Sequence, residues 1–178
     1  WVLPDPDVEV LRGCHDRLAL RQPATLTLAP SGALRLGHSA VAGALSFRYT
    51  PQLRLRIAGR GADSLALARL AMASGIETEL QLRDGADVQA ARRLGVDRVT
   101  VLTLPATLPV LDDDPWTAFL LAFHDADWEE RLLAQALTGP ACYVGAVGSR
   151  KSHVMRCERL RATGVEEGQL RRIRGPVG

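Results

Sequence analysis

Hydrophobic and polar positions change their rhythm close to residue 50 of this 178-residue chain. Before that point, apolar and polar residues alternate over Ala24–Leu28 and again over Ala33–Leu36, with the turn residues Pro30-Ser31-Gly32 between them. Alternation of this kind predicts the two strands of a β-hairpin. We expect a short helix over Val8–Arg21 before the hairpin and a third strand over Ser46–Tyr49 after it.

After that point, short apolar runs alternate with segments of helical periodicity. The predicted strands are a first one beginning at Leu53, then Ile76–Leu82, Val99–Leu104, Ala118–Phe123 and Ala141–Val147. The predicted helices are Ala62–Ser74, Val88–Leu94, one that opens at Asp127 and ends near Gly139, Lys151–Ala162 and Glu166–Ile173, and Asp112-Asp113-Asp114-Pro115 is expected to be a break. Strands that alternate with helices imply a parallel sheet with right-handed crossovers. We therefore expect an α/β protein, with a Rossmann-like doubly wound parallel sheet of about five strands over residues 51–178 and a small β-rich unit over residues 1–50.

The first of these strands ends in the glycine turn Gly59-Arg60-Gly61, and a helix follows at once. Glycine allows a tight turn and a close approach to the backbone, and the free N–H groups of a helix N-terminus favour phosphate. The dinucleotide fingerprint is G-x-G-x-x-G/A, and its last position here is Ser64. These glycines therefore indicate either a binding site for a phosphate-containing ligand or a tight turn with a purely structural role.

Titratable residues follow two further predicted strands. Asp84 comes just after the second strand, where a carboxylate could accept hydrogen bonds from ribose hydroxyls, although Asp84-Gly85 is also a turn dipeptide. His124-Asp125-Ala126-Asp127 comes directly after the most apolar strand, and burying an unpaired charge there would be costly. His124 could act as acid, base, metal ligand or hydrogen-bond donor. We assign helix capping to Asp127 and keep His124 and Asp125 as site candidates.

A last strand-to-helix turn is Gly148-Ser149-Arg150. A glycine, a hydroxyl and a cation before a helix can bind an anion together with the free N–H groups of the helix N-terminus. The alternative is that Arg150 is simply solvated.

Composition excludes several classes of function. The net charge is only +2, the arginines are scattered and aromatic residues are few, so we expect no nucleic-acid partner. Three cysteines without paired metal spacing suit a reducing compartment, so we expect a cytoplasmic protein with no metal site. No apolar run reaches the roughly 18–20 residues of a membrane span, so no membrane partner is expected. The chain begins at Trp1 and stops at Gly178, which suggests a fragment.

Several stretches together resemble the XdhC family of xanthine dehydrogenase accessory proteins, which is related to the CoxI and CoxF maturation factors. They are Pro115–Phe119, Phe123–Glu129, Tyr143–His153 and Arg172–Gly178. The resemblance covers Leu53–Gly178, and residues 1–50 resemble the end of the family's N-terminal domain.

The resemblance implies a C-terminal Rossmann domain that binds molybdenum cofactor and supports its sulfuration and insertion into xanthine dehydrogenase-type hydroxylases. This is a maturation chaperone rather than a turnover enzyme, so no catalytic residue is assigned. The expected partners are the apo-molybdoenzyme, a cysteine desulfurase and a second copy of the chain in a dimer. The candidate cofactor-binding residues are Gly59, Gly61, Ser64, Asp84, His124, Asp125, Gly148, Ser149 and Arg150.

Two departures from the family pattern keep other functions open. The family's turn usually reads G-A-G-x-x-G/A, whereas Arg60 and Ser64 stand here, and its N-terminal serine-glycine-glycine-cysteine stretch is absent from this sequence. The alternative function is an NAD(P)-dependent oxidoreductase that uses the Gly59–Gly61 turn. A third interpretation is a Rossmann-type interaction module without a ligand.

Overall fold

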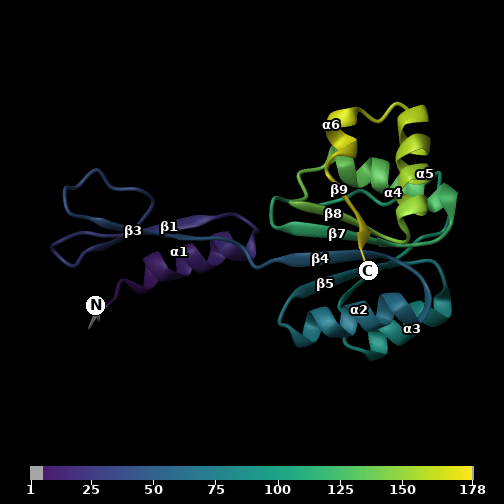
Figure 1. Cartoon of the computed structure of the whole chain (residues 1–178). Coiled ribbons are helices and arrows are strands. Elements are labelled where there is room, and N and C mark those ends of the chain that lie inside the picture. The colour runs from purple at the N-terminus through teal and green to yellow at the C-terminus, as the bar shows by residue number, and fades with distance from the viewer. Residues whose placement is uncertain (1–5, 178) are drawn as a thin grey trace. The chain divides into compact units, whose positions relative to one another are not determined.

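The computed structural model describes residues 6–177 (Figure 1). The chain divides into two compact units, with the boundary between Gln52 and Leu53. Within the described residues, no helix is long and apolar enough to cross a membrane.

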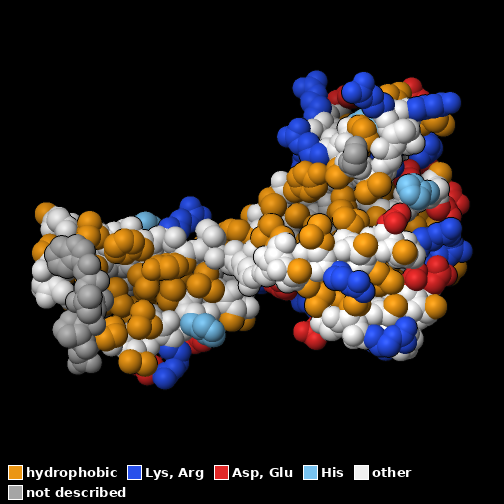
Figure 2. Space-filling view, turned by 60° about the horizontal axis from the view of Figure 1, so that its bottom comes forward, with side chains coloured by type: hydrophobic (Ala, Val, Ile, Leu, Met, Phe, Trp, Pro, Cys, Tyr) orange, Lys and Arg blue, Asp and Glu red, His pale blue; other side chains and the backbone are white. Residues whose placement is uncertain are grey.

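The first unit is one helix packed on a three-stranded antiparallel sheet, as the alternating pattern predicted. Its elements are α1 (Val8–Ala19), β1 (Ala24–Leu28), β2 (Leu34–Leu36) and β3 (Leu45–Tyr49), with strand order β2-β1-β3. Cys14, Ala24 and Leu26 form its small core. Hydrophobic side chains are frequent on its surface (Figure 2), and those of Leu45 and Phe47 on the edge strand β3 are exposed.

The second unit is a six-stranded parallel sheet with helices on both faces, which confirms the Rossmann-like fold. Its strands are β4 (Arg54–Gly59), β5 (Glu77–Leu82), β6 (Arg98–Val101), β7 (Thr117–Ala122), β8 (Tyr143–Val147) and β9 (Ile173–Val177). Its helices are α2 (Gly61–Ala73), α3 (Gly85–Arg93), α4 (Ala126–Thr138), α5 (Arg150–Ala162) and α6 (Glu167–Leu170). The helices α2 and α3 cover one face of the sheet, and α4, α5 and α6 cover the other (Figure 1).

The strand order is β6-β5-β4-β7-β8-β9. From β4 the chain moves outward to β6, crosses back to β7 and then moves outward in the other direction to β9. The direction therefore reverses between β4 and β7, where Gly59 lies opposite Ala122. In open parallel sheets this reversal leaves a crevice at the carboxyl ends of the strands.

The expected number of strands, about five, was one too low. The last predicted helix was extended to Ile173, but α6 ends at Leu170 and Ile173–Val177 pairs with β8 as an edge strand. The dipeptide Gly175-Pro176 argued against a strand here, because proline lacks the N–H that a central strand needs. An edge strand tolerates proline.

The connection from β6 to β7 contains no helix and is fixed by ion pairs with two buried arginines, where only a break was expected. Arg56 of β4 donates from Nε to Asp113 Oδ1 at 2.9 Å and from Nη2 to Asp113 Oδ2 at 2.5 Å. Its guanidinium carbon lies 4.2 Å from the centre of the Phe119 ring. Arg54 donates from Nη1 to Asp112 Oδ2 at 3.1 Å. These contacts hold the connection against the same sheet face as α4.

Asp112 is expected to make stability sensitive to acid. Burial alone would raise the pKa of its carboxyl, but hydrogen bonds from Arg98 and Arg54 outweigh it and hold the pKa below the usual 3.8. The stabilisation is therefore complete above the unfolded-state pKa and is lost as the pH falls through the lower folded-state pKa. Urea unfolding of wild type and Asp112→Asn should differ slightly at about pH 6, and the difference should shrink as the pH falls below the usual pKa of 3.8. A difference that stays constant across this range would contradict the assignment.

Candidate functional site

The glycine turn after β4 is shaped by close packing of α2 on the sheet. A Cβ atom added at Gly59 would lie 2.1 Å from Ser64 Oγ and 3.0 Å from Ala122 Cβ. Ser64 is fully buried, and its hydroxyl donates to the Arg60 carbonyl oxygen at 3.3 Å. Ser64 thus occupies the helix-packing position of the glycine fingerprint and faces the interior of the domain.

The backbone N–H of Gly61, at the start of α2, is already paired. Gly61 has φ +71° and donates its N–H to Asp87 Oδ2 at 2.6 Å. Asp87 lies in the first turn of α3, and the sequence did not single it out. The Asp87 carboxylate accepts the Gly61 N–H that a bound phosphate would otherwise accept. Asp63, in the first turn of α2, adds a second negative charge.

The end of β5 brings an arginine toward the crevice. Asp84 is the N-cap residue of α3, its side chain makes no capping hydrogen bond, and the Asp84-Gly85 dipeptide opens a helix. The neighbouring Arg83 was not predicted as a site residue. Its Nη1 lies 3.8 Å from Asp125 Oδ2, and its guanidinium carbon lies 6.0 Å from the centre of the Trp128 ring. Its position directly after a predicted parallel strand was the signal that could have identified it.

The turn after β7 corrects the capping assignment. Asp125 is the N-cap of α4 and accepts the N–H of Asp127 at 3.1 Å, so the prediction that Asp127 caps the helix was wrong. The helix begins one residue earlier than expected, at Ala126. His124, just before the cap, is exposed and lines two pockets.

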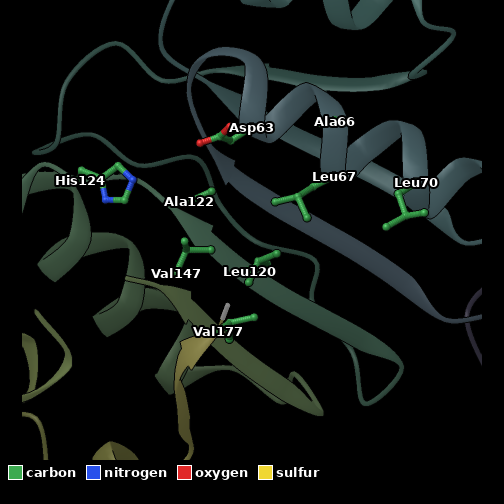
Figure 3. Close-up of a pocket in the computed structure, with 9 residues that line it drawn as sticks. All are labelled: Asp63, Ala66, Leu67, Leu70, Leu120, Ala122, His124, Val147 and Val177. Atoms are coloured by element: carbon green, nitrogen blue, oxygen red, sulfur yellow. The ribbon is translucent and has the colours of Figure 1, made fainter. Parts of the chain in front are cut away.

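The larger of these pockets, here called the apolar pocket, has a volume of about 410 Å³. It lies between α2 and the strands β7, β8 and β9 (Figure 3). Its lining residues are Asp63, Ala66, Leu67, Leu70, Leu120, Ala122, His124, Val147 and Val177. Asp63 and His124 are the polar lining residues, and both lie at the carboxyl end of the strands, away from Leu70 (Figure 3).

The second pocket, here called the polar pocket, has a volume of about 230 Å³. Its lining residues are His124, Ala126, Glu129, Ser152, Met155, Arg156 and Arg159. Arg156 is 1% exposed, and its Nε and Nη2 each donate to a carboxylate oxygen of Glu129 at 3.2 Å. Arg159 Nη2 donates to Glu129 as well, at 3.0 Å. In sequence these charges resemble a solvated helix surface, and only the packing of α4 on α5 reveals that Glu129 and Arg156 are buried.

The turn after β8 lies beside the polar pocket. Ser149 is the N-cap of α5 and accepts the N–H of Ser152 at 3.1 Å. Gly148 has φ +144°, a conformation that disfavours side chains. Arg150 is exposed and lines neither pocket. Among the nine residues predicted to bind a cofactor, His124 is thus the one that lines these pockets. Within residues 6–177, no group of three or more His, Cys, Asp and Glu side chains could hold a metal ion.

Known proteins resemble this chain in sequence and in fold. The family model of the XdhC Rossmann domain matches residues 55–178. The chain is 28% identical over 130 residues to the molybdenum cofactor insertion chaperone PaoD of Escherichia coli K12, covering 73% of this chain and 34% of PaoD. It therefore spans about a third of that relative. A solved structure described as a xanthine dehydrogenase from Bacillus halodurans matches with a TM-score of 0.71 and 19% identity, over 96% of this chain and 59% of that one. At this identity the second likeness concerns the fold alone.

Proposed function

Since this chain belongs to the XdhC Rossmann-domain family, we propose that it binds molybdenum cofactor as cargo and delivers it to a molybdoenzyme. The name of PaoD, a molybdenum cofactor insertion chaperone, supports this role. We further propose that the client is a xanthine dehydrogenase-type apo-enzyme and that sulfuration of the cofactor precedes delivery.

The observation that carries the proposal is the apolar pocket beside His124 at the point where the strand order reverses. Its volume of about 410 Å³ lies within the range of small-ligand sites, about 300–1,000 Å³. Such sites combine apolar walls with a few polar groups that fix orientation. Here Leu67 and Val147 supply apolar wall, and His124 supplies a polar group at the mouth.

This arrangement suits holding a flat, reactive ring system. The pterin part of the cofactor would pack between Leu67 of α2 and Val147 of β8, which would exclude water from one part of its surface. His124 would hydrogen-bond to a polar edge of the ring. No residue in this assignment performs a chemical step, in keeping with a carrier that does not itself transform its cargo. Partnership with a cysteine desulfurase and formation of a dimer stay predictions.

Filling the apolar pocket is expected to weaken cofactor binding. Ala66 is exposed on α2 and lines the pocket, so Ala66→Trp places an indole in the proposed ring position without burying it in the core. We expect the dissociation constant for molybdenum cofactor, titrated anaerobically, to rise at least about tenfold, because the ring loses its apolar contacts.

The matched control is Ala73→Trp, an exposed position at the end of the same helix that does not line the pocket. It should bind as wild type does. The proposal fails if wild type shows no binding, or if the two tryptophan variants bind equally well. A parallel calorimetric titration with NADH and NADPH tests the oxidoreductase alternative, for which we expect no binding because Asp87 already occupies the Gly61 N–H.

A further inference from the structure

We propose that the polar pocket is a binding site for a phosphate-class oxyanion. It lies between the first turn of α4 and α5, and the pterin-binding role assigned above leaves it unused apart from His124. The hydrogen bonds between Glu129 and the two arginines join α4 to α5, but they leave one strong donor without an acceptor.

That donor is the Nη1 amino group of Arg156. A guanidinium carries five N–H groups, of which Nε and Nη2 account for three. These three have acceptors, namely the two oxygens of Glu129 and the carbonyl oxygen of Val147 at 3.0 Å. Nη1 is buried and has no hydrogen-bond partner among the described residues. A buried, charged donor without an acceptor is costly, and Arg156 lines this pocket, so the residue points to an acceptor from outside the chain.

The donors around the pocket suit an anion. Its lining includes the guanidinium groups of Arg156 and Arg159 and the carboxylate of Glu129, and Glu130, which is outside the lining, pairs with Arg159 Nε at 2.7 Å. Both Glu129 oxygens accept hydrogen bonds from these arginines, so its charge is already compensated. Ala126 adds the N-terminus of a 13-residue helix, whose free N–H groups carry partial positive charge. Ser152 adds a hydroxyl.

The size of the pocket agrees with this ligand class. Its volume of about 230 Å³ is many times the roughly 10–15 Å³ that a single water requires. A tetrahedral oxyanion has several acceptor oxygens, so one ion can accept from Arg156 and from the start of α4 together.

At the glycine turn on the other side of the crevice, the backbone donor is already paired. Its Gly61 N–H is held by the Asp87 carboxylate, and Asp63 lies in the same first turn of α2. A phosphate placed there would have to displace one carboxylate and lie beside another. The Gly61 donor is therefore occupied whereas Arg156 Nη1 is not, so we expect the phosphate end of a ligand in the polar pocket and not at the glycine turn.

If the chain binds molybdenum cofactor as proposed above, this difference determines which way round the cofactor lies. His124 lines both pockets, so they meet at this side chain. The pterin ring would lie in the apolar pocket, and the phosphate of the cofactor would pass His124 into the polar pocket.

Inorganic phosphate is the probe for the site itself. Titrated into the ¹⁵N-labelled protein, it should shift the backbone amide resonances of Ala126 and Ser152 most. The Arg159→Gln variant should weaken phosphate binding about tenfold, since it removes a charged donor without touching the buried Arg156. Arg161→Gln is the matched control, because Arg161 lies on the same helix but is exposed and pairs with Glu167. Largest shifts at Gly61 and Asp63, no saturable shift, or equal loss in both variants would overturn the proposal.

Competition separates this inference from the proposed function. Phosphate should weaken binding of molybdenum cofactor to wild type and have much less effect on Arg159→Gln. If phosphate binds in the polar pocket without competing, the oxyanion site stands and the proposed orientation of the cargo is wrong. If the cofactor does not bind at all while phosphate does, the proposed function falls and the oxyanion site remains.

Discussion

Replacing Asp113 by asparagine is expected to lower the free energy of unfolding by about 3–5 kcal/mol. The side chains of Asp113 and Arg56 are only 2% and 1% exposed, and they form a two-pronged ion pair. The substitution keeps the shape of the side chain but leaves the Arg56 charge buried without a counter-ion. Chemical denaturation monitored by circular dichroism measures the loss.

The adjacent Asp112→Asn is the control for this prediction. Asp112 also pairs with an arginine of β4, but its side chain is 64% exposed. The buried Arg54 keeps the carboxylates of Glu79 and Asp114 at 3.9 Å, and an exposed carboxylate adds at most about 1 kcal/mol, so this variant should be nearly as stable as wild type. The double variant Arg56→Leu with Asp113→Leu should recover much of the lost stability, because it removes both charges. Equal losses for the two single asparagine variants would contradict the prediction.

Gly59→Ala is expected to cost roughly 3 kcal/mol, the upper end of over-packing effects, and to disrupt the glycine turn. The new methyl group would lie 2.1 Å from Oγ of the fully buried Ser64 and 3.0 Å from Ala122 Cβ. The start of α2 must then shift away from β4, which also displaces one wall of the apolar pocket. Thermal unfolding and the cofactor titration should therefore both change.

Two further variants test whether the cause is steric. Gly85→Ala introduces the same methyl group at the start of α3, where no atom lies within 4 Å, and it should be neutral or slightly stabilising. Combining Gly59→Ala with Ser64→Gly removes the clashing hydroxyl, so the double variant should be more stable than the sum of the single effects predicts. Additive losses would show that the contact with Ser64 is not the cause.

The sequence was sufficient for the elements that have strong local patterns. The apolar run before His124, the glycine turn at Gly59 and the hydrophobic periodicity of α2 each depend on residues close together in the chain. They predicted the Rossmann-like sheet and the ends of the strands that border the crevice. The family resemblance was then confirmed by the match to residues 55–178.

The parts of the site that escaped prediction depend on contacts between distant residues. Asp87 reaches the N–H of Gly61 because α3 packs beside α2, 26 positions along the chain. Arg156 and Glu129 are 27 positions apart and become buried only when α5 packs on α4. No local pattern distinguishes such residues from a solvated helix surface. The pockets consequently involve charges that the sequence suggested were exposed.

The pairing of β4 with β7 has a consequence for how this domain folds. Arg54 lies opposite Thr117, so the two central strands join only after a loop of more than 60 residues closes, and the Arg56–Asp113 pair closes a loop of similar length. Closing long loops costs entropy before contacts repay it, which slows folding. The strand ends that border the crevice come together in this same step. A nascent chain therefore has no complete crevice until β4 and β7 have paired.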